Sequence, residues 1–423
     1  MIATAKLQEQ TGGLRSWQHG AAFLCAFAVI AARRPDAILR PQFWAEDGRV
    51  FYGDAYNLGP WIALFRPYGG YFHAVPRLAA CLVLLVPLSH APLVLNLVAI
   101  AVQALPATLL LASRSSVWGS LRYRALLAGI YLALPNCWEL GAIITNSQCL
   151  LALSAFLLLV ASIPGSMRGW LINISFLLLA GLSGPYCIFL LPFAMFLAWK
   201  HSERGRWLYV GVLAACSLVQ TWGLLILSPG IRLHYYLGAS LESFAHVLAG
   251  QVYLGTLIGS NSLAFHPGPR LSVFIYFVAI GGTAIVAASI ANSILEMRLF
   301  VLFSCMILVA SLISPAIHAP PGVPLWELMA SAGGIHYWFF PTLTFAWCVV
   351  FCFASRVLLL RIIAGYLLFF FCIGIVRDFR QPAFKDMQFN DYAARFEAAP
   401  PGTAVTIPLN PDGWSMTLVK HAE

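Results

Sequence analysis

The sequence predicts an all-α polytopic membrane protein with about eleven transmembrane helices. Hydrophobic residues make up 60% of the 423 positions and charged residues 10%, whereas soluble domains carry about 25% charged residues. The mean hydropathy is +0.81. The apolar residues cluster into runs such as 93–112 and 271–291, which have the length a helix needs to cross hydrocarbon. Lipid is therefore the expected solvent for most of the chain.

The first apolar run follows Lys6 and Arg15, and Arg33-Arg34-Pro35 comes directly after it. Small residues would mark a signal-peptide cleavage site at that place, so we predict an uncleaved first span. Nine cysteines lie in or beside the apolar runs, where we interpret them as small buried hydrophobic residues. The predicted spans lie near 17–33, 91–113, 124–136, 148–163, 169–182, 185–200, 207–227, 271–292, 299–313, 338–355 and 361–376.

The segment 71–88 decides the topology, because it is apolar enough to span but is interrupted by Pro76 and Pro87. If it stays outside, ten basic residues between Arg114 and Arg361 fall in cytoplasmic loops, as the positive-inside rule expects. We therefore predict a re-entrant or surface-lying helix pair here. The net charge of +9 is then an orientation signal, and no nucleic-acid partner is expected.

This topology predicts a transmembrane domain over 1–376, with a first extracytoplasmic loop at 34–90, and a small extracytoplasmic tail over 377–423. The tail has the pattern of a folded cap. The residues Asn410-Pro411-Asp412-Gly413 are typical of a turn between strands. We expect a helix over Lys385–Ala398 and strands over Ala404–Ile407 and Trp414–Leu418.

The strongest local signal for chemistry is the acidic pair Glu46 and Asp47, which follows the first span. Two adjacent carboxylates are costly at a membrane surface unless they are solvated or used. On an α-helix, Phe51 and Asp54 would share a face with Asp47, so Asp47 is the expected inward group. The alternative is a solvated helix start, with acids at the positive end of the helix dipole.

A second group contains Arg66, His73 and Arg77, which could form an anion site. Interfacial arginines that pair with lipid headgroups are the alternative. Further along, Asn146 belongs to a polar patch, Thr145-Asn146-Ser147-Gln148, at the entrance of a span, where Thr145 or Asn146 could instead cap a helix.

Other polar residues lie in the later outer loops. Arg270 ends the longest middle loop, and His336 and Tyr337 open the tenth span. No two histidines in these loops have the spacing of a metal pair, so we predict no histidine metal ligand.

Four short segments carry a resemblance to a known class: Trp44-Ala45-Glu46-Asp47-Gly48, Thr145-Asn146-Ser147-Gln148, Ser183-Gly184-Pro185 and Gly334-Ile335-His336-Tyr337. Together with the loop arrangement, they resemble a bacterial subgroup of multi-pass proteins in the GT-C class of membrane glycosyltransferases. The resemblance covers nearly the whole chain. It implies that a sugar moves from a polyprenyl-phosphate carrier to a glycan or lipid acceptor, on the extracytoplasmic face of the bacterial inner membrane.

The resemblance also implies roles for single residues. Glu46 or Asp47 would act as general base on the acceptor hydroxyl or hold it in place. Asn146 would correspond to the contact from the second outer loop. Arg66, Arg77 or Arg270 would balance the charge of the leaving carrier phosphate. Apart from the resemblance, His73, His336 and Tyr337 are candidate substrate-binding residues. The subgroup would have an arginine where His336 stands. No cofactor is implied, and assistance by a divalent metal ion is left open.

Two other functions compete with glycosyl transfer: a transporter or flippase of lipid-linked sugars, and a non-catalytic membrane protein of envelope assembly. The predicted spans after residue 90 have no Asp, Glu, Lys or Arg away from their ends. Ion-coupled transporters generally need such groups at membrane depth, which weakens the transporter hypothesis.

Overall fold

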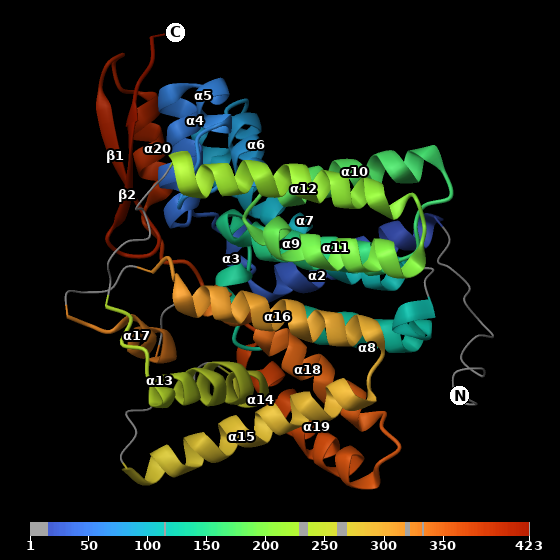
Figure 1. Cartoon of the computed structure of the whole chain (residues 1–423). Helices are drawn as coiled ribbons and strands as arrows, with labels where there is room; N and C mark the ends of the chain where they lie inside the picture. Colours follow the sequence, from blue (N-terminus) through green and yellow to red (C-terminus); the bar gives the residue numbers. More distant parts are fainter. Residues whose placement is uncertain are drawn as a thin grey trace. The chain divides into compact units, whose positions relative to one another are not determined.

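The computed structural model of the chain is nearly all helical (Figure 1). It describes residues 16–113, 116–227, 236–259, 269–317, 322–331 and 334–422. The contacts divide the chain into two compact units. Unit 1 comprises Met1–Ser16, Leu110–Glu139 and Arg232–Arg380, and unit 2 comprises Trp17–Leu109, Leu140–Ile231 and Gln381–Glu423.

Unit 2 contains the first predicted outer loop, several long helices and the tail. Helices α10, α11 and α12 lie side by side in it (Figure 1). Its elements are α2 (Ser16–Arg33), α3 (Asp36–Leu39), η1 (Asp47–Tyr52), α4 (Gly53–Leu58), α5 (Pro60–Leu64), α6 (Ala74–Val83), η2 (Leu88–His90), α7 (Ala91–Ala112), η5 (Ile144–Asn146), α9 (Ser147–Val160), α10 (Met167–Gly181), α11 (Tyr186–His201), α12 (Arg206–Trp222), η6 (Gly223–Leu227), α20 (Phe389–Glu397), β1 (Ala404–Leu409) and β2 (Trp414–Val419).

Unit 1 is helical throughout its described part. Its elements are η3 (Ser116–Trp118), α8 (Leu121–Leu132), η4 (Trp138–Leu140), α13 (Leu241–His246), η7 (Val247–Leu254), α14 (Gly255–Ile258), α15 (Pro269–Asn292), α16 (Leu295–Ile313), α17 (Leu325–Ser331), η9 (Ile335–Trp338), α18 (Phe339–Phe353) and α19 (Leu358–Asp378). Helix α18 packs against both α15 and α19, and most of its side chains are buried.

A helix occupies each of the eleven predicted spans, although α8 ends at Leu132, before the predicted end. Serine caps stabilise the start of three helices. The side chains of Ser120, Ser166 and Ser240 each accept a hydrogen bond from a backbone N–H of the following turn. Each bond satisfies a donor that the helix itself leaves unpaired. Among the described residues, six segments are long and apolar enough to cross a membrane: Leu88–Ala112, Arg206–Leu227, Val273–Asn292, Leu295–Ile313, Ile335–Phe353 and Leu358–Asp378. For the shorter helices, crossing remains a prediction.

The segment 71–88 contains one helix, α6, followed by turns, rather than the expected pair of helices. Its ten residues give a length of about 15 Å, which is half of the hydrocarbon thickness of about 30 Å. This helix is therefore too short to cross a bilayer by itself, and its apolar side chains Leu78 and Leu82 are exposed.

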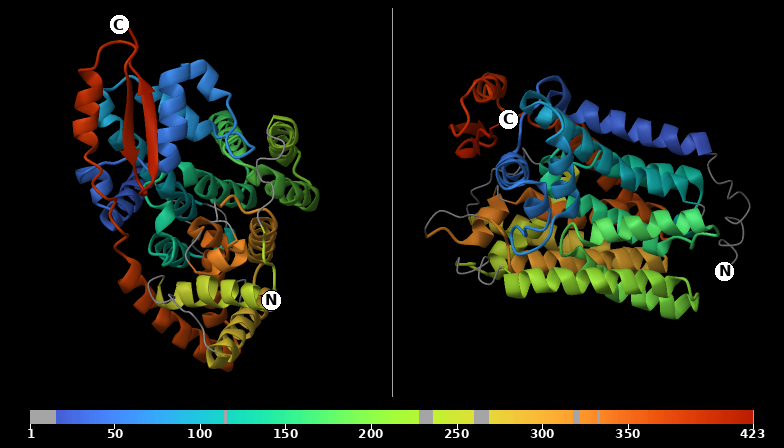
Figure 2. Two further views of the ribbon diagram at one scale, coloured as in Figure 1. Left: turned by 90° about the vertical axis from the view of Figure 1, so that its left-hand side faces the viewer. Right: turned by 90° about the horizontal axis from the view of Figure 1, so that it is seen from above.

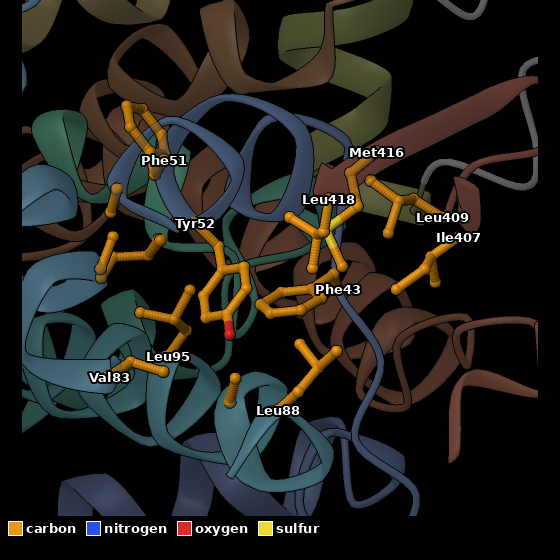
Figure 3. Close-up of a cluster of buried hydrophobic side chains, with 14 of the residues drawn as sticks. Phe43, Phe51, Tyr52, Val83, Leu88, Leu95, Ile407, Leu409, Met416 and Leu418 are labelled. Atoms are coloured by element: carbon orange, nitrogen blue, oxygen red, sulfur yellow. The ribbon is translucent and has the colours of Figure 1, made fainter. Parts of the chain in front are cut away.

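The tail contains the predicted helix and strands, but its helix begins at Phe389, four residues later than predicted. Helix α20 lies beside an antiparallel pair of strands (Figure 2), and the predicted turn, 410–413, joins β1 to β2. Both strands exceed their predicted ends by one or two residues. Leu409, Met416 and Leu418 pack into one buried cluster with Phe43 and Tyr52 of the first predicted loop (Figure 3). The tail and the segment that carries Glu46 and Asp47 therefore share a hydrophobic core.

Candidate functional site

Asp47 is fully buried at the start of η1, where 1% of its surface is exposed. The backbone N–H of Thr145 donates to its Oδ1 over 2.9 Å and that of Ile144 to its Oδ2 over 3.1 Å. The hydroxyl of Thr145 also donates to Oδ1. Both carboxylate oxygens are thus occupied by the turn that precedes α9, and Asp47 joins two segments that are far apart in the sequence.

Burial changes the acidity of this carboxyl group. Desolvation raises the pKa of Asp47 from 3.8 to about 7, and the neighbouring charge of Glu46 acts in the same direction. The hydrogen bonds from Thr145 and Ile144 lower the pKa but do not offset the burial. In the folded protein Asp47 therefore keeps its proton to a higher pH than an ordinary aspartate does.

Glu46 is the more exposed member of the acidic pair, since its side chain is only half-buried. The hydroxyl of Tyr68 donates to its Oε1 at 3.4 Å. Burial and the charge of Glu46 both raise the pKa of Tyr68, so this phenol stays protonated and can keep donating. Glu46 is consequently the carboxylate of the pair that an external molecule can reach.

Asp54 does not share partners with Asp47, contrary to the expectation of a common helical face. Residues 47–52 form a π-helix, in which hydrogen bonds run from residue i to i+5, so the α-helical spacing on which that expectation rested does not apply. Asp54 instead accepts from Nη1 of Arg66 at 2.7 Å and from Nη1 of Arg77 at 2.8 Å. Phe51 lies under the guanidinium of Arg77, 5.1 Å from ring centre to Cζ.

The two arginines differ in their surroundings. Arg77 is 1% exposed, and its Nε and Nη2 find no hydrogen-bond partner among the described residues. Burial lowers its pKa and Asp54 opposes this effect. The side chain of Arg66 is 52% exposed. Arg66 can therefore meet an anion from outside, whereas the charge of Arg77 is balanced internally by Asp54.

His73 is buried among aromatic rings, and its ring is tilted against that of Tyr71 with 4.6 Å between ring centres. Its Nε2 lies 3.2 Å from the carbonyl oxygen of Tyr68. Its backbone forms a bridge with Ser183, whose hydroxyl accepts the N–H of Val75. This histidine thus sits where two chain segments are held together, within the same unit as the acidic pair.

The polar patch at 145–148 connects to the same group. The amide of Gln148 donates to the hydroxyl of Tyr71 at 3.3 Å. Asn146 precedes α9 and is buried, but its side chain makes no capping hydrogen bond. Thr145, the alternative cap residue, donates to Asp47 instead.

A separate group lies in unit 1. Nδ1 of His336 is 2.7 Å from Oε2 of Glu139, and the backbone N–H of His336 donates to the same oxygen at 3.1 Å. The hydroxyl of Tyr337 accepts the N–H of Ala316. Glu139 and His336 are 197 residues apart in the sequence, and no local sequence pattern pairs them. The side chain of Arg270 lies outside the described residues.

Within the described part of the chain, no three His, Cys, Asp or Glu side chains are grouped so that they could hold a metal ion. The sequence matches no protein-family model and no curated protein, and its structure matches no solved structure.

Proposed function

We propose that the protein is a membrane glycosyltransferase that moves a sugar from a polyprenyl-phosphate carrier to a glycan or lipid acceptor outside the cytoplasm. The observation that carries the proposal is the acidic pair, in which a buried carboxylate, Asp47, anchors the backbone next to a reachable one, Glu46. Catalysis requires a reactive side chain that is held in a defined position by a rigid backbone.

The reaction needs a proton acceptor and a partner for a developing anion. The acceptor oxygen forms a bond to the anomeric carbon while the bond from that carbon to the carrier phosphate breaks. The proton of the acceptor hydroxyl passes to Glu46, and the bonding electrons leave with the phosphate. Positive charge develops on the sugar and negative charge on the carrier, so a nearby carboxylate and guanidinium both stabilise the transition state.

The burial of Asp47 supports giving the proton-accepting role to Glu46, although the sequence favours Asp47. All three donors that reach Asp47 come from Ile144 and Thr145, so a substrate would have to displace them. Asp47 then acts as a positioning residue. Arg66 is the cation for the carrier phosphate, because its side chain is the exposed one. The roles of Asn146, Arg270, His336 and Tyr337 remain predictions.

The test uses the full chain, purified and reconstituted in liposomes with radiolabelled hexosyl and pentosyl polyprenyl phosphates and a membrane extract as the source of acceptor. Glycosylated product in the presence of the protein supports the proposal. Movement of the labelled carrier across the bilayer without product would support a flippase, and neither event with any donor would leave the assembly protein as the better hypothesis.

A further inference from the structure

A cavity of about 440 Å³ lies in unit 2, away from the acidic pair. It is bounded by α4, the start of α5, the segment 84–88, helix α20 and the end of the chain after β2. Its size falls in the range of about 300 to 1,000 Å³ that is typical of small-molecule sites. Neither carboxylate of the acidic pair and neither arginine bound to Asp54 lines it, so it is distinct from the proposed transfer site.

The cavity walls are mainly apolar. Ala55, Leu84, Val86, Leu88 and Phe396 contribute aliphatic and aromatic surface. Two stacked tyrosines, Tyr52 and Tyr56, with ring centres 6.3 Å apart, complete one wall. Such a lining suits a hydrocarbon chain and offers few polar groups to a sugar.

Lys420 and His421 line the cavity together with Glu397. The ammonium group of Lys420 lies over the ring of Phe396 and donates to the carbonyl oxygen of Glu397 at 3.2 Å. The ring of His421 packs edge-on against Tyr56 at 4.8 Å. An ammonium group has three donors, so Lys420 can bind an anion and keep its contact with the carbonyl oxygen.

Exposed apolar side chains lie close in sequence to residues that line the cavity. Trp61 is 77% exposed and directly follows the lining residue Pro60, and Leu85 is 82% exposed between Leu84 and Val86. Leu82, one turn earlier in α6, is 65% exposed. The described part of the chain has six helices that could cross a membrane by length and composition, and in such a protein this surface on short helices is typical of contact with the bilayer interface.

We infer that this cavity binds an anionic phospholipid of the surrounding bilayer, with one acyl chain against Leu84 and Val86 and the headgroup phosphate at Lys420 and His421. The inference does not depend on glycosyl transfer, because it rests on residues outside the proposed transfer site.

The experiment uses the full chain in nanodiscs that contain a trace of phosphatidylglycerol with a photoreactive diazirine on one acyl chain. A phosphatidylcholine probe with the same chain serves as the reference. After illumination, labelled peptides are identified by mass spectrometry. We expect phosphatidylglycerol to label peptides that contain 52–60 or 84–88 several-fold more than phosphatidylcholine does.

Two kinds of variant test the two ends of the cavity. Lys420→Ala should reduce labelling by phosphatidylglycerol about fivefold, since one basic residue near a membrane contributes about that factor to binding. The control is Lys385→Ala, which lies in the same tail but is paired with Asp412. It should leave the labelling unchanged. Val86→Phe should reduce labelling by both probes by filling the cavity. Thermal melting identifies any variant that fails to fold, and Leu84→Phe then replaces Val86→Phe. Equal labelling by the two probes in the parent, or labelling unchanged by Lys420→Ala and by the filling variant, would overturn the inference.

Discussion

Asp47 and Thr145 lie 98 residues apart in the sequence and are joined by two hydrogen bonds, one from the backbone N–H over 2.9 Å and one from the hydroxyl. The N–H of Ile144 occupies the other carboxylate oxygen. Because Glu46 directly precedes Asp47 in the chain, these bonds also fix the backbone from which its side chain extends.

Thr145→Val keeps the shape of the side chain but removes the hydroxyl donor. We expect it to lower the free energy of unfolding by about 1 to 2 kcal/mol, because a hydrogen bond to a buried carboxyl group is lost. Melting temperatures in detergent measure the effect. Thr403→Val is the matched control, since Thr403 is exposed and should tolerate the change. Equal melting temperatures for the two variants would contradict the buried position of Asp47.

Asp47 should make the protein less stable as pH rises from about 4 to about 7. Its pKa in the folded protein is about 7 and its ordinary value is 3.8, so the folded state binds the proton more tightly than the unfolded state. The contribution of Asp47 to the free energy of unfolding is fully present below pH 4 and is lost as pH rises through 7. A pKa shift of this size corresponds to about 4 kcal/mol.

The measurement compares the melting temperatures of the parent and Asp47→Asn in detergent at several pH values. Other carboxyl groups contribute equally to both proteins, so the difference between the two isolates Asp47. The melting temperature of Asp47→Asn should rise relative to that of the parent between pH 4 and pH 7. A difference that is independent of pH would show that the pKa of Asp47 is not raised.

The two ion pairs of Asp54 should contribute unequally to stability. Asp54→Asn leaves the buried guanidinium of Arg77 without its counter-charge, and removal of one partner of a buried pair costs about 3 to 5 kcal/mol. Arg66→Ala should cost less than about 1 kcal/mol, because that pair is exposed to solvent. Chemical denaturation in mixed micelles measures both variants, and equal losses would be inconsistent with the different burial of the arginines.

Arg66 should also bind the carrier, whereas Arg77 should act on folding. Lysine cannot hold a phosphate in the bidentate manner of arginine, so Arg66→Lys should weaken binding of a polyprenyl-phosphate sugar with little change in melting temperature. Arg77→Lys should lower the melting temperature instead. Normal carrier binding by Arg66→Lys would leave Arg66 as a headgroup anchor.

The tail and the first loop should face the outside of the cytoplasm. An introduced cysteine at the exposed Thr403 should react with a membrane-impermeant maleimide in intact spheroplasts, and one at the exposed Arg204 should react only after lysis. Labelling of the parent corrects for its own cysteines. The reverse pattern would place the acidic pair on the cytoplasmic side.

Local sequence patterns predict much of the fold. Apolar runs predict the positions of the long helices, because every turn of a spanning helix must be apolar. The turn residues 410–413 predict the hairpin of the tail. The π-helix of residues 47–52 has no comparable signal. The α-helical spacing therefore gave Asp54 the wrong neighbours.

The partners of charged residues could not be predicted from the sequence, because they depend on contacts between distant segments. Asp47 is bound by Ile144 and Thr145, Arg77 by Asp54, and His336 by Glu139. The patterns did mark most of these residues as unusual, since polar groups in an apolar chain are few. The helical spacing did select Asp47 as the inward member of the acidic pair, and Asp47 is the buried one, but the spacing did not indicate its partners.

The most direct test is the rate of sugar transfer by Glu46→Gln in liposomes, with a donor that the parent uses. The variant keeps the size of the side chain and removes its charge. The rate should fall by about 10² to 10⁴, as expected for loss of a general base, while carrier binding and melting temperature stay close to those of the parent. Glu242→Gln, which removes an exposed charge elsewhere, should transfer at the parent rate. A Glu46→Gln rate equal to that of the parent would contradict the proposed role of Glu46.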